Sequence, residues 1–453
     1  MDFVSHMEKM RTRPMEPIHA IKGTTDILTG QVEIWLTIEE AVRKWMRVFG
    51  CEEIRTPIFE ETRLFARSIG DDTDIVGKEM YTFTDMGGRN ISLRPEGTAS
   101  VIRAFIENSL DQRGLPQSLW YMGPMFRQER PQKGRHRQFH QFGAEVIGAL
   151  SPRVDADIMD LFNWISGDMG LSDRKYMINY IGGSESRARY KHAFVAFLDP
   201  LEQVLCPDCR RRKHTNPLRV LDCKVPSCRD AIHSAPNLPP ITDALTGEDS
   251  LNYNAIKQHL DEYDIRYEED PFLVRGLDYY TGIVFEMHYK GLGAQSAIMG
   301  GGRYDTLVKD LGGPDLPAVG FACGIERLML AMREAGLPPP EEHIRVFVVN
   351  PPDTVNASPI VFSCVREIRR KGFIALTDYQ EGRSVKAQMR SASRANAHYV
   401  LFISDTKGNV EMRDMRNSMQ KPMSFQQFLS YLENQFPSHT TTGIPNAIEA
   451  NPE

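Results

Sequence analysis

The chain reads FRQERPQKGRHRQFHQFGAE from Phe126 to Glu145. Aromatic and polar residues flank a loop of basic residues, so the segment is predicted to form a strand, a basic loop and a second strand. Side chains alternate along a regular strand, which places on one face Phe139, Gln141, Gly143 and Glu145. This face offers an aromatic ring, an amide and a carboxylate beside cations, which suits a ligand with an aromatic base, phosphates and an amine. A solvated hairpin is the alternative interpretation.

The composition indicates a globular protein with two or three domains, because 453 residues exceed one ordinary core. Hydrophobic residues make up 41% of the chain, and no apolar run approaches the roughly 18 residues that span a bilayer, which argues against a membrane role. Seven cysteines and no secretory signal point to a reducing cytoplasm. The net charge of −6 disfavours nonspecific nucleic-acid binding, so any RNA contact must come from local basic patches.

Upstream of the basic loop, apolar residues recur at helical spacing from Gln31 to Phe49 and predict an amphipathic helix. The next segment, Ile54 to Phe59, is predicted to be a short strand. It carries Pro57, which cannot donate to a sheet ladder and therefore indicates an edge or an interface, or else an ordinary strand end.

Downstream, prolines, cysteines and basic residues interrupt the strand-rich chain and predict an inserted module at 184–265. Three consecutive prolines between Gly336 and Glu342 predict an extended linker. Strands and helices then alternate and predict a small α/β domain with a largely parallel sheet. The predicted elements are strands Val346–Val349, Phe373–Leu376 and Tyr399–Ile403, with helices near Ile360–Lys371 and Ser384–Ala395. Residues 1–16 are expected to be a flexible extension and residues 437–453 a disordered tail.

Two further segments carry chemistry. VRGLDYYTG, from Val274 to Gly282, is predicted to place Arg275 at a strand end beside two tyrosine hydroxyls, although a turn with core aromatics fits equally. GFACGIERL, from Gly320 to Leu328, is predicted to run from a strand into a helix with Arg327 in the first turn. A cation is repelled by the positive N-terminal end of a helix, so helix stability does not explain Arg327. An anion bound between Arg327 and the helix end explains it better. A surface-exposed arginine is the alternative.

Taken in order, with the helix that ends before Pro57, these segments resemble motifs one, two and three of class II aminoacyl-tRNA synthetases. Within that class, LRPEGT from Leu93 to Thr98, the RPQKGRxRQFHQ loop, RGLDYYTG and GGGRYD from Gly300 resemble bacterial-type histidyl-tRNA synthetases. The resemblance implies an α+β fold. It consists of a class II antiparallel-sheet catalytic core over 17–338, an inserted helical module, and an α/β anticodon-binding domain over 344–436.

The resemblance also implies roles for individual residues. Histidine is expected to bind Glu96, Gly97, Thr98, Gln141, Glu145, Tyr279 and Tyr280. ATP is expected to bind Arg127, Glu129, Arg135, Phe139 and Arg327. The catalytic residues are expected to be Arg127 and Arg275, which flank the reacting carboxylate and the α-phosphate together with Mg²⁺. The other implied partners are tRNA(His) and a second copy of the chain.

Two clusters of residues are hypotheses of the sequence itself. In the insert, Cys206-x₂-Cys209 and then Cys223-x₄-Cys228 can supply four thiolates to a structural zinc ion, or they are four reduced thiols. In the C-terminal domain, a basic stripe at helical spacing is predicted to contact tRNA, although a solvated helix face also explains it. The stripe consists of Arg383, Lys386, Arg390 and Arg394.

The rival hypothesis is a histidine-binding regulatory paralogue of an ATP phosphoribosyltransferase complex. Such a protein would lack the C-terminal domain and the ATP-binding arginines, and this chain has both. A noncatalytic RNA-binding module would not need the pocket of Glu96, Gln141 and Glu145.

Overall fold

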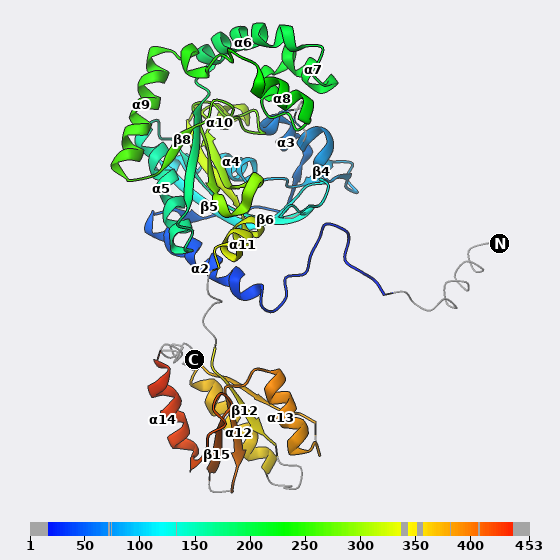
Figure 1. The fold of residues 1–453 in the computed structure, drawn as a ribbon, viewed down its shortest axis with the longest axis vertical. Coiled ribbons are helices and arrows are strands. Elements are labelled where there is room, and N and C mark those ends of the chain that lie inside the picture. Colours follow the sequence, from blue (N-terminus) through cyan, green and yellow to red (C-terminus); the bar gives the residue numbers. More distant parts are fainter. Residues whose placement is uncertain are drawn as a thin grey trace, which may run out of the picture. The chain divides into compact units, whose positions relative to one another are not determined.

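The computed structural model describes residues 17–437 except 71, 72, 74, 133, 337–342, 351–356, 381, 406 and 407. The predicted N-terminal extension at 1–16, most of the proline linker and the tail from 438 onward lie outside the described residues. The chain forms two compact units, Met1–Pro338 and Pro339–Glu453 (Figure 1). None of the described helices is both long and apolar enough to cross a membrane.

The first unit is built on an eight-stranded sheet, which is antiparallel except for one parallel pair at each edge. Its strands, in spatial order, are β1 (Glu52–Glu53), β5 (Gln117–Phe126), β6 (Gln138–Ile147), β11 (Ala318–Gly324), β10 (Ala297–Arg303), β9 (Ile283–Tyr289), β7 (Arg174–Tyr180) and β8 (Tyr267–Glu269). A smaller sheet pairs β4 (Asn90–Leu93) with β2 (Phe59–Glu61) and β3 (Thr82–Thr84). The predicted antiparallel core is confirmed.

The two faces of the large sheet have separate cores. On one face, α2 (Val32–Val48), α5 (Pro152–Asp168) and α11 (Ile325–Glu334) pack against apolar side chains such as Phe142 of β6. On the other face, α4 (Thr98–Glu107) and the insert pack around a second apolar cluster. Strand alternation along β6 therefore sends neighbouring residues to opposite cores, as predicted.

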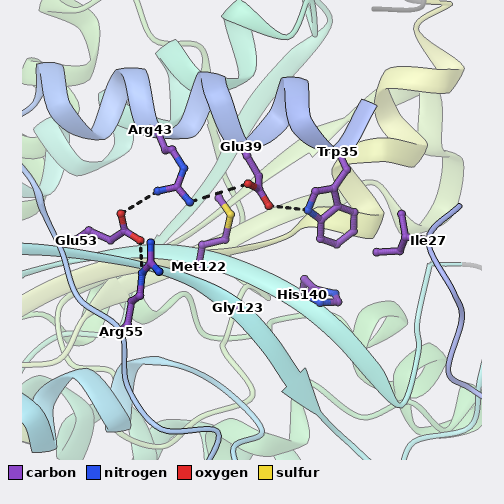
Figure 2. A pocket seen from close by; sticks show the side chains of 9 residues that line it. All are labelled: Ile27, Trp35, Glu39, Arg43, Glu53, Arg55, Met122, Gly123 and His140. Carbon is purple, nitrogen blue, oxygen red and sulfur yellow. Dashed lines mark hydrogen bonds and ion pairs between the residues drawn. The ribbon is translucent and has the colours of Figure 1, made fainter. Parts of the chain in front are cut away.

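The predicted amphipathic helix is α2, and its apolar stripe lies against the sheet. Trp35 meets the ring of His140 edge to face, with ring centroids 4.7 Å apart, and donates from Nε1 to Glu39 at 2.9 Å. Figure 2 shows the cavity of about 350 Å³ beneath α2, where Arg43 pairs with Glu53 at 2.8 Å. Charged groups thus line the space between helix and sheet beside the second strand of the basic hairpin.

The prediction of one strand over Ile54 to Phe59 was wrong. β1 ends before this segment and β2 begins only at Phe59. In between, the carbonyl oxygens of Thr56 and Pro57 accept from Nη1 of Arg94 at 3.1 and 3.4 Å. A buried arginine therefore replaces the sheet ladder that Pro57 interrupts.

The insert consists of helices, as predicted. Its elements are α6 (Ser184–Leu198), η3 (Asp199–Leu201), α7 (Pro207–Thr215), η4 (Pro217–Val220), α8 (Pro226–Ser234), η5 (Ile241–Ala244) and α9 (Gly247–Glu262). α7 and α8 each begin with a proline at the first helical position, where its missing N–H has no cost.

The second unit has a five-stranded sheet, of which the sequence predicted three strands and two helices correctly. Its parallel part is β13 (Ile374–Thr377), β12 (Arg345–Val349) and β14 (Tyr399–Ile403), accompanied by α12 (Ala357–Arg370) and α13 (Val385–Arg394). Antiparallel β15 (Asn409–Asp414) and β16 (Gln420–Ser424), and α14 (Phe425–Gln435), were not predicted. β15 alternates polar and apolar residues around only two buried hydrophobic side chains, so its apolar pattern is short.

The basic stripe needs one correction. Arg383 lies outside α13, because Ser384 is the N-cap and its Oγ accepts from the backbone of Ala387 at 3.3 Å. Arg383 instead pairs with Asp378 at 2.7 Å. Lys386, Arg390 and Arg394 are exposed on the helix at spacings of four residues and remain a stripe of three cations.

Candidate active site

A cavity of about 770 Å³ opens on the face of the sheet opposite α2. Strand β6 contributes Phe139 and Gln141 to its wall, whereas the intervening His140 lines the cavity beneath α2. All of the predicted ATP-binding and catalytic residues line this cavity: Arg127, Glu129, Arg135, Phe139, Arg275 and Arg327. The three sequence segments, which lie up to 200 residues apart, therefore meet at one place.

The cavity carries an excess of positive charge. Seven lining residues are lysine or arginine, and five are aspartate or glutamate. The cations come from the basic hairpin, the insert, the loop after β8 and α11. Cations and carboxylates together suit a polyphosphate that carries a divalent metal ion.

Two arginines of the cavity donate to backbone carbonyl groups. Arg127 donates from Nε to the carbonyl of Pro95 at 2.9 Å, and its guanidinium lies 5.2 Å from the ring centroid of Phe139. Arg327, in the first turn of α11, donates from Nε to the carbonyl of Ala297 at 2.8 Å. Both guanidinium groups are fixed before any ligand binds, which lowers the entropic cost of binding.

The prediction that Arg275 ends a strand was wrong. Arg275 lies in the loop between β8 and β9, where its Nη1 forms an ion pair with Glu286. Glu286 also accepts from His288 at 3.0 Å, and His288 contacts Ser296 at 2.8 Å. Burial alone would lower the pKa of Arg275, but the carboxylate of Glu286 outweighs it and raises that pKa. Arg275 is therefore a permanent cation.

Several of the predicted histidine-binding residues are buried together around Glu145. The Glu145 carboxyl accepts from the hydroxyl of Thr98 at 2.7 Å and from that of Tyr304. Its side chain is 1% exposed, and burial raises its pKa to about 8. The rings of Tyr279 and Tyr280 pack beside Tyr304, with centroids 5.4 and 6.4 Å away.

A second carboxylate, Glu96, caps the N-terminus of α4, next to Thr98. Its two oxygens accept from the backbone N–H groups of Thr98 at 2.7 Å and Ala99 at 2.8 Å. These are orphan donors at the N-terminus of α4. Burial raises the pKa of Glu96, although both backbone bonds oppose that rise. The capped carboxylate has free lone pairs left for a ligand cation.

Gln141 connects the two regions. Among the described residues, its buried Oε1 has no hydrogen-bond partner. An unpaired buried amide oxygen costs about 1–3 kcal/mol, so a ligand donor would relieve that penalty. An ammonium group suits this position.

Glycines make the space that these side chains occupy. A Cβ on Gly97 would overlap the ring of Tyr121, and one on Gly320 would overlap the carboxyl of Glu145. A Cβ on Gly300 would likewise overlap the guanidinium of Arg275. The second and third positions come from β11 and β10, which explains why glycine interrupts both apolar strands.

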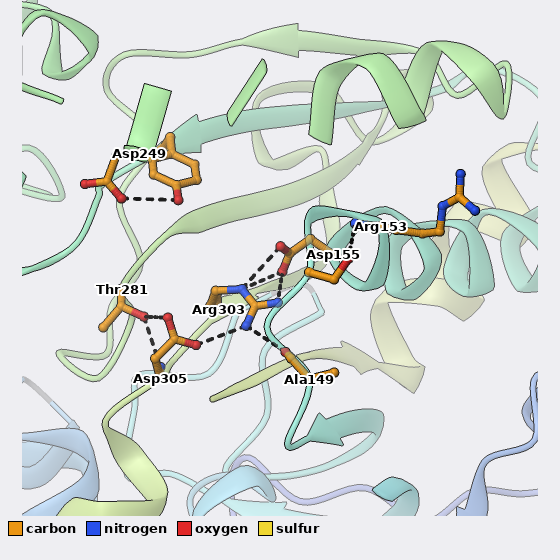
Figure 3. Close-up of polar contacts among 9 residues, drawn as sticks. Ala149, Arg153, Asp155, Asp249, Thr281, Arg303 and Asp305 are labelled. Carbon is orange, nitrogen blue, oxygen red and sulfur yellow. Dashed lines mark hydrogen bonds and ion pairs between the residues drawn. The ribbon is translucent and has the colours of Figure 1, made fainter. Parts of the chain in front are cut away.

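Arg303 is the centre of an ion network that lies close in sequence to Tyr304 and Tyr280 (Figure 3). Arg303 of β10 is 4% exposed; it pairs with Asp155 of α5 at 2.8 Å and with Asp305 at 3.0 Å. The backbone N–H of Asp305 donates to the hydroxyl of Thr281 at 3.0 Å. The network joins α5 to the two chain segments that carry Tyr304 and Tyr280.

Sequence reasoning missed Glu286, and it gave Tyr304 no role although it noted GGGRYD. Glu286 had a usable signal, since it is the only acidic residue within the apolar strand IVFEMHY. A buried charge in such a strand requires a partner. Tyr304 had none, because its contact with Glu145 joins residues 159 positions apart.

The pKa of Glu145 predicts a pH-dependent stability. The carboxyl binds its proton more tightly in the folded chain, near pKa 8, than in the unfolded chain, near 4.5. The protonated carboxyl of Glu145 therefore contributes to the free energy of unfolding. This contribution is fully present below pH 4.5 and is lost as pH rises towards 8. We expect the unfolding free energy of the wild type to fall by several kcal/mol relative to Glu145→Gln over this range, at about 1.4 kcal/mol per pKa unit. Urea unfolding of both proteins at pH 5, 6, 7 and 8 measures this; parallel curves would contradict it.

Comparisons with known proteins place this geometry in a family. The model of the histidyl-tRNA synthetase family matches residues 23–177 and 218–328, and the anticodon binding domain model matches 344–435. The histidine--tRNA ligase of Thermosipho melanesiensis is 47% identical over 404 residues, covering 88% of this chain and 94% of the relative. That of Staphylococcus carnosus is 43% identical over 421 residues, covering 91% and 97%.

A solved structure agrees in fold. The apo histidyl-tRNA synthetase of S. aureus superposes with a TM-score of 0.76 at 36% identity, covering 92% of this chain and 99% of that one. The cavity with its cations, the buried carboxyl groups of Glu96 and Glu145, and the matched family models lead to the same conclusion: the chain belongs to the histidyl-tRNA synthetase family.

Proposed function

We propose that this protein activates L-histidine with ATP and transfers it to the 3′ end of tRNA(His), releasing diphosphate and AMP. The observation that carries the proposal is the single face of β6, where Phe139 and Gln141 line the cationic cavity and the buried Glu145 accepts from Thr98. Histidine-dependent exchange of pyrophosphate into ATP is the test. An exchange that histidine does not stimulate would refute the activity.

The chemistry requires no protein nucleophile. A carboxylate oxygen of histidine attacks the α-phosphorus of ATP, and the bond from that phosphorus to the bridging oxygen breaks as diphosphate leaves. A ribose hydroxyl of the tRNA then attacks the carbonyl of the adenylate, and AMP leaves. Arg127 and Arg275 neutralise the charge that develops at the α-phosphate.

ATP arrives with Mg²⁺ on its phosphates. Glu79 and Glu129 are carboxylates of the cavity wall that could hold this ion, since Mg²⁺ prefers oxygen ligands. For the adenine, the proposed stacking and cation–π partners are Phe139 and Arg327, which line the same cavity.

Selection of histidine depends on buried polar groups. Glu145 and Tyr279 are proposed to pair with the imidazole, while Glu96, Thr98 and Gln141 hold the α-ammonium. An amino acid that leaves these groups unpaired is rejected, because desolvated groups without partners are costly.

The regulatory paralogue is not favoured. Such a protein would lack the C-terminal unit, and here residues 344–435 match the anticodon binding domain model. The cations of the ATP site are also all present in the cavity.

The C-terminal unit is proposed to bind the anticodon region. Removing residues from Ile344 onward should leave pyrophosphate exchange possible but severely weaken tRNA charging.

Neutralising Lys386 and Arg390 should weaken tRNA binding and flatten its dependence on salt, because fewer counterions are released. Filter binding from 50 to 200 mM salt measures the slope of tRNA affinity against salt concentration. Neutralisation of Arg383, which is paired to Asp378, is the matched control. An unchanged slope would make the stripe a solvated face.

A homodimer is the proposed assembly. Apolar Ile58 and Phe59, beside Pro57, are 43% and 57% exposed, which favours cover by a second copy at α2 and this segment. We expect sedimentation to give a dimer at micromolar concentration, and an active monomer would contradict the expectation.

Two proposals concern the cysteines. All seven are free thiols, which is in keeping with a reducing cytoplasm as the compartment. Four of them, in the insert, are proposed to hold a structural zinc ion that takes no part in the chemical steps.

A further inference from the structure

The insert brings together four cysteines that are distant in sequence. The sulfur atoms of Cys206, Cys209, Cys223 and Cys228 all lie within 4.8 Å of one another. Cys206 and Cys223 have sulfurs 3.9 Å apart. Four thiolates around zinc at about 2.3 Å stand roughly 3.8 Å from each other, so the cluster needs only a small contraction to coordinate the ion.

Two of the four cysteines lie at the N-terminal ends of helices. Cys206 is the N-cap of α7, and Cys228 lies in the first turn of α8, so both sulfurs stand at positive helix ends. The backbone N–H of Cys206 also donates to the sulfur of Cys228 at 2.8 Å. Such donors to a ligand sulfur orient and stabilise metal sites.

The segment between the two cysteine pairs contacts Asp278, in the loop between β8 and β9 that also carries Arg275. Asn216 donates from Nδ2 to Oδ1 of Asp278 at 2.8 Å, and Arg219 donates from Nε to the same oxygen at 2.7 Å. Arg219 is 6% exposed and, together with Asp222, lines the cationic cavity. The insert therefore contributes directly to the wall of the proposed ATP site.

Asp278 connects the insert to the proposed histidine-binding residues. It immediately precedes Tyr279 and Tyr280, and its backbone N–H donates to the carbonyl of Ile69 at 3.2 Å. A Cβ on Gly70 would overlap its carboxylate. Asp278 is thus confined between α3 (Thr62–Ile69) and the insert.

We infer that zinc on the four thiolates fixes residues 210–222 against Asp278 and so sets the position of Tyr279 and Tyr280 in the histidine pocket. Binding exchanges up to four thiol protons for one Zn²⁺, with no change of oxidation state. The coupling to histidine deepens the proposed function and rests on it, whereas the metal site stands on the cysteine geometry alone. Arg219 and Asn216 are positioning residues that act through Asp278.

The metal site is tested on the full chain purified without chelator. We expect about one zinc per chain, and Co²⁺ substitution should give the visible absorption of a tetrahedral tetrathiolate. Cys223→Ser should lose the metal. Cys364→Ser, a buried cysteine of the second unit, is the matched control and should keep it. Less than one tenth of a zinc per chain after reconstitution, with four thiols that titrate freely or as disulfides, would overturn the site.

The coupling is tested by separating KM from kcat in histidine-dependent exchange. Removal of zinc and Arg219→Met should each raise the KM for histidine by about tenfold and change kcat less, as loss of an outer-shell contact does. Arg219→Met should still bind one zinc, and Arg219→Lys should restore part of the affinity. Zinc binding with an unchanged KM in both cases would overturn the coupling, while a wild type without exchange would refute the proposed function and leave the metal result standing.

Discussion

Replacing Arg275 by alanine is expected to lower the rate of adenylate formation by about 10²–10³-fold, the usual effect of removing one preorganised donor at a developing charge. Histidine binding should weaken far less, because the contact strengthens only as charge builds on the α-phosphate. Single-turnover activation, together with equilibrium binding of histidine, separates the two effects. In Arg275→Ala, the carboxylate of Glu286 also loses its ion pair with this arginine.

Arg275→Lys is the conservative comparison. A lysine keeps the charge but cannot present the planar fork that meets Glu286 and a phosphate together, so it should restore only part of the rate. Equal losses of histidine affinity and activation rate in Arg275→Ala would assign this residue to binding of the ground state and contradict the proposed role.

Glu145→Gln is expected to lower kcat/KM for histidine on the order of 10³-fold. The two carboxyl oxygens accept from Thr98 and Tyr304, and an amide replaces one of these oxygens by an NH₂ group, which donates and cannot accept. The imidazole therefore loses a hydrogen-bond partner. Steady-state exchange kinetics over a range of histidine concentrations measure the loss.

Thr98→Val provides the matched control for Glu145→Gln. It removes one hydroxyl donor from the same carboxyl, together with the proposed contact of Thr98 to the α-ammonium, but leaves the acceptor for the imidazole in place. Its effect should be smaller, about 10-fold. If Thr98→Val and Glu145→Gln have the same small effect, Glu145 is a structural carboxyl and the imidazole is bound elsewhere.

Much of this site could be predicted because its residues lie in short continuous segments. Phe139 and Gln141 follow from the period of one strand, and Arg327 from its position at a strand-to-helix junction. The same holds for the C-terminal unit, where buried parallel strands such as Val346–Val349 are nearly continuous apolar runs.

The errors have a different physical origin. Arg275 was assigned to a strand end because local pattern cannot show that Glu286 holds it in a loop. The ladder expected at Pro57 is replaced by Arg94, which comes from 37 residues further along the chain. Arg383 fitted a helical spacing, yet the cap at Ser384 decides where the helix begins. In each case a side-chain partner overrides a periodicity that the sequence does contain.

The alternation along β6 limits how the gene for this protein can change in length. Adding or removing one codon between Gln138 and Ile147 would turn every later side chain to the opposite face. Phe142 would leave its core for the cavity, and Glu145 would leave Thr98 and Tyr304. In the insert, helices are joined by loops, and a change in loop length does not turn side chains from one face of a sheet to the other. Length variation among descendants of this gene is therefore expected to accumulate in the insert and to be absent from the strand.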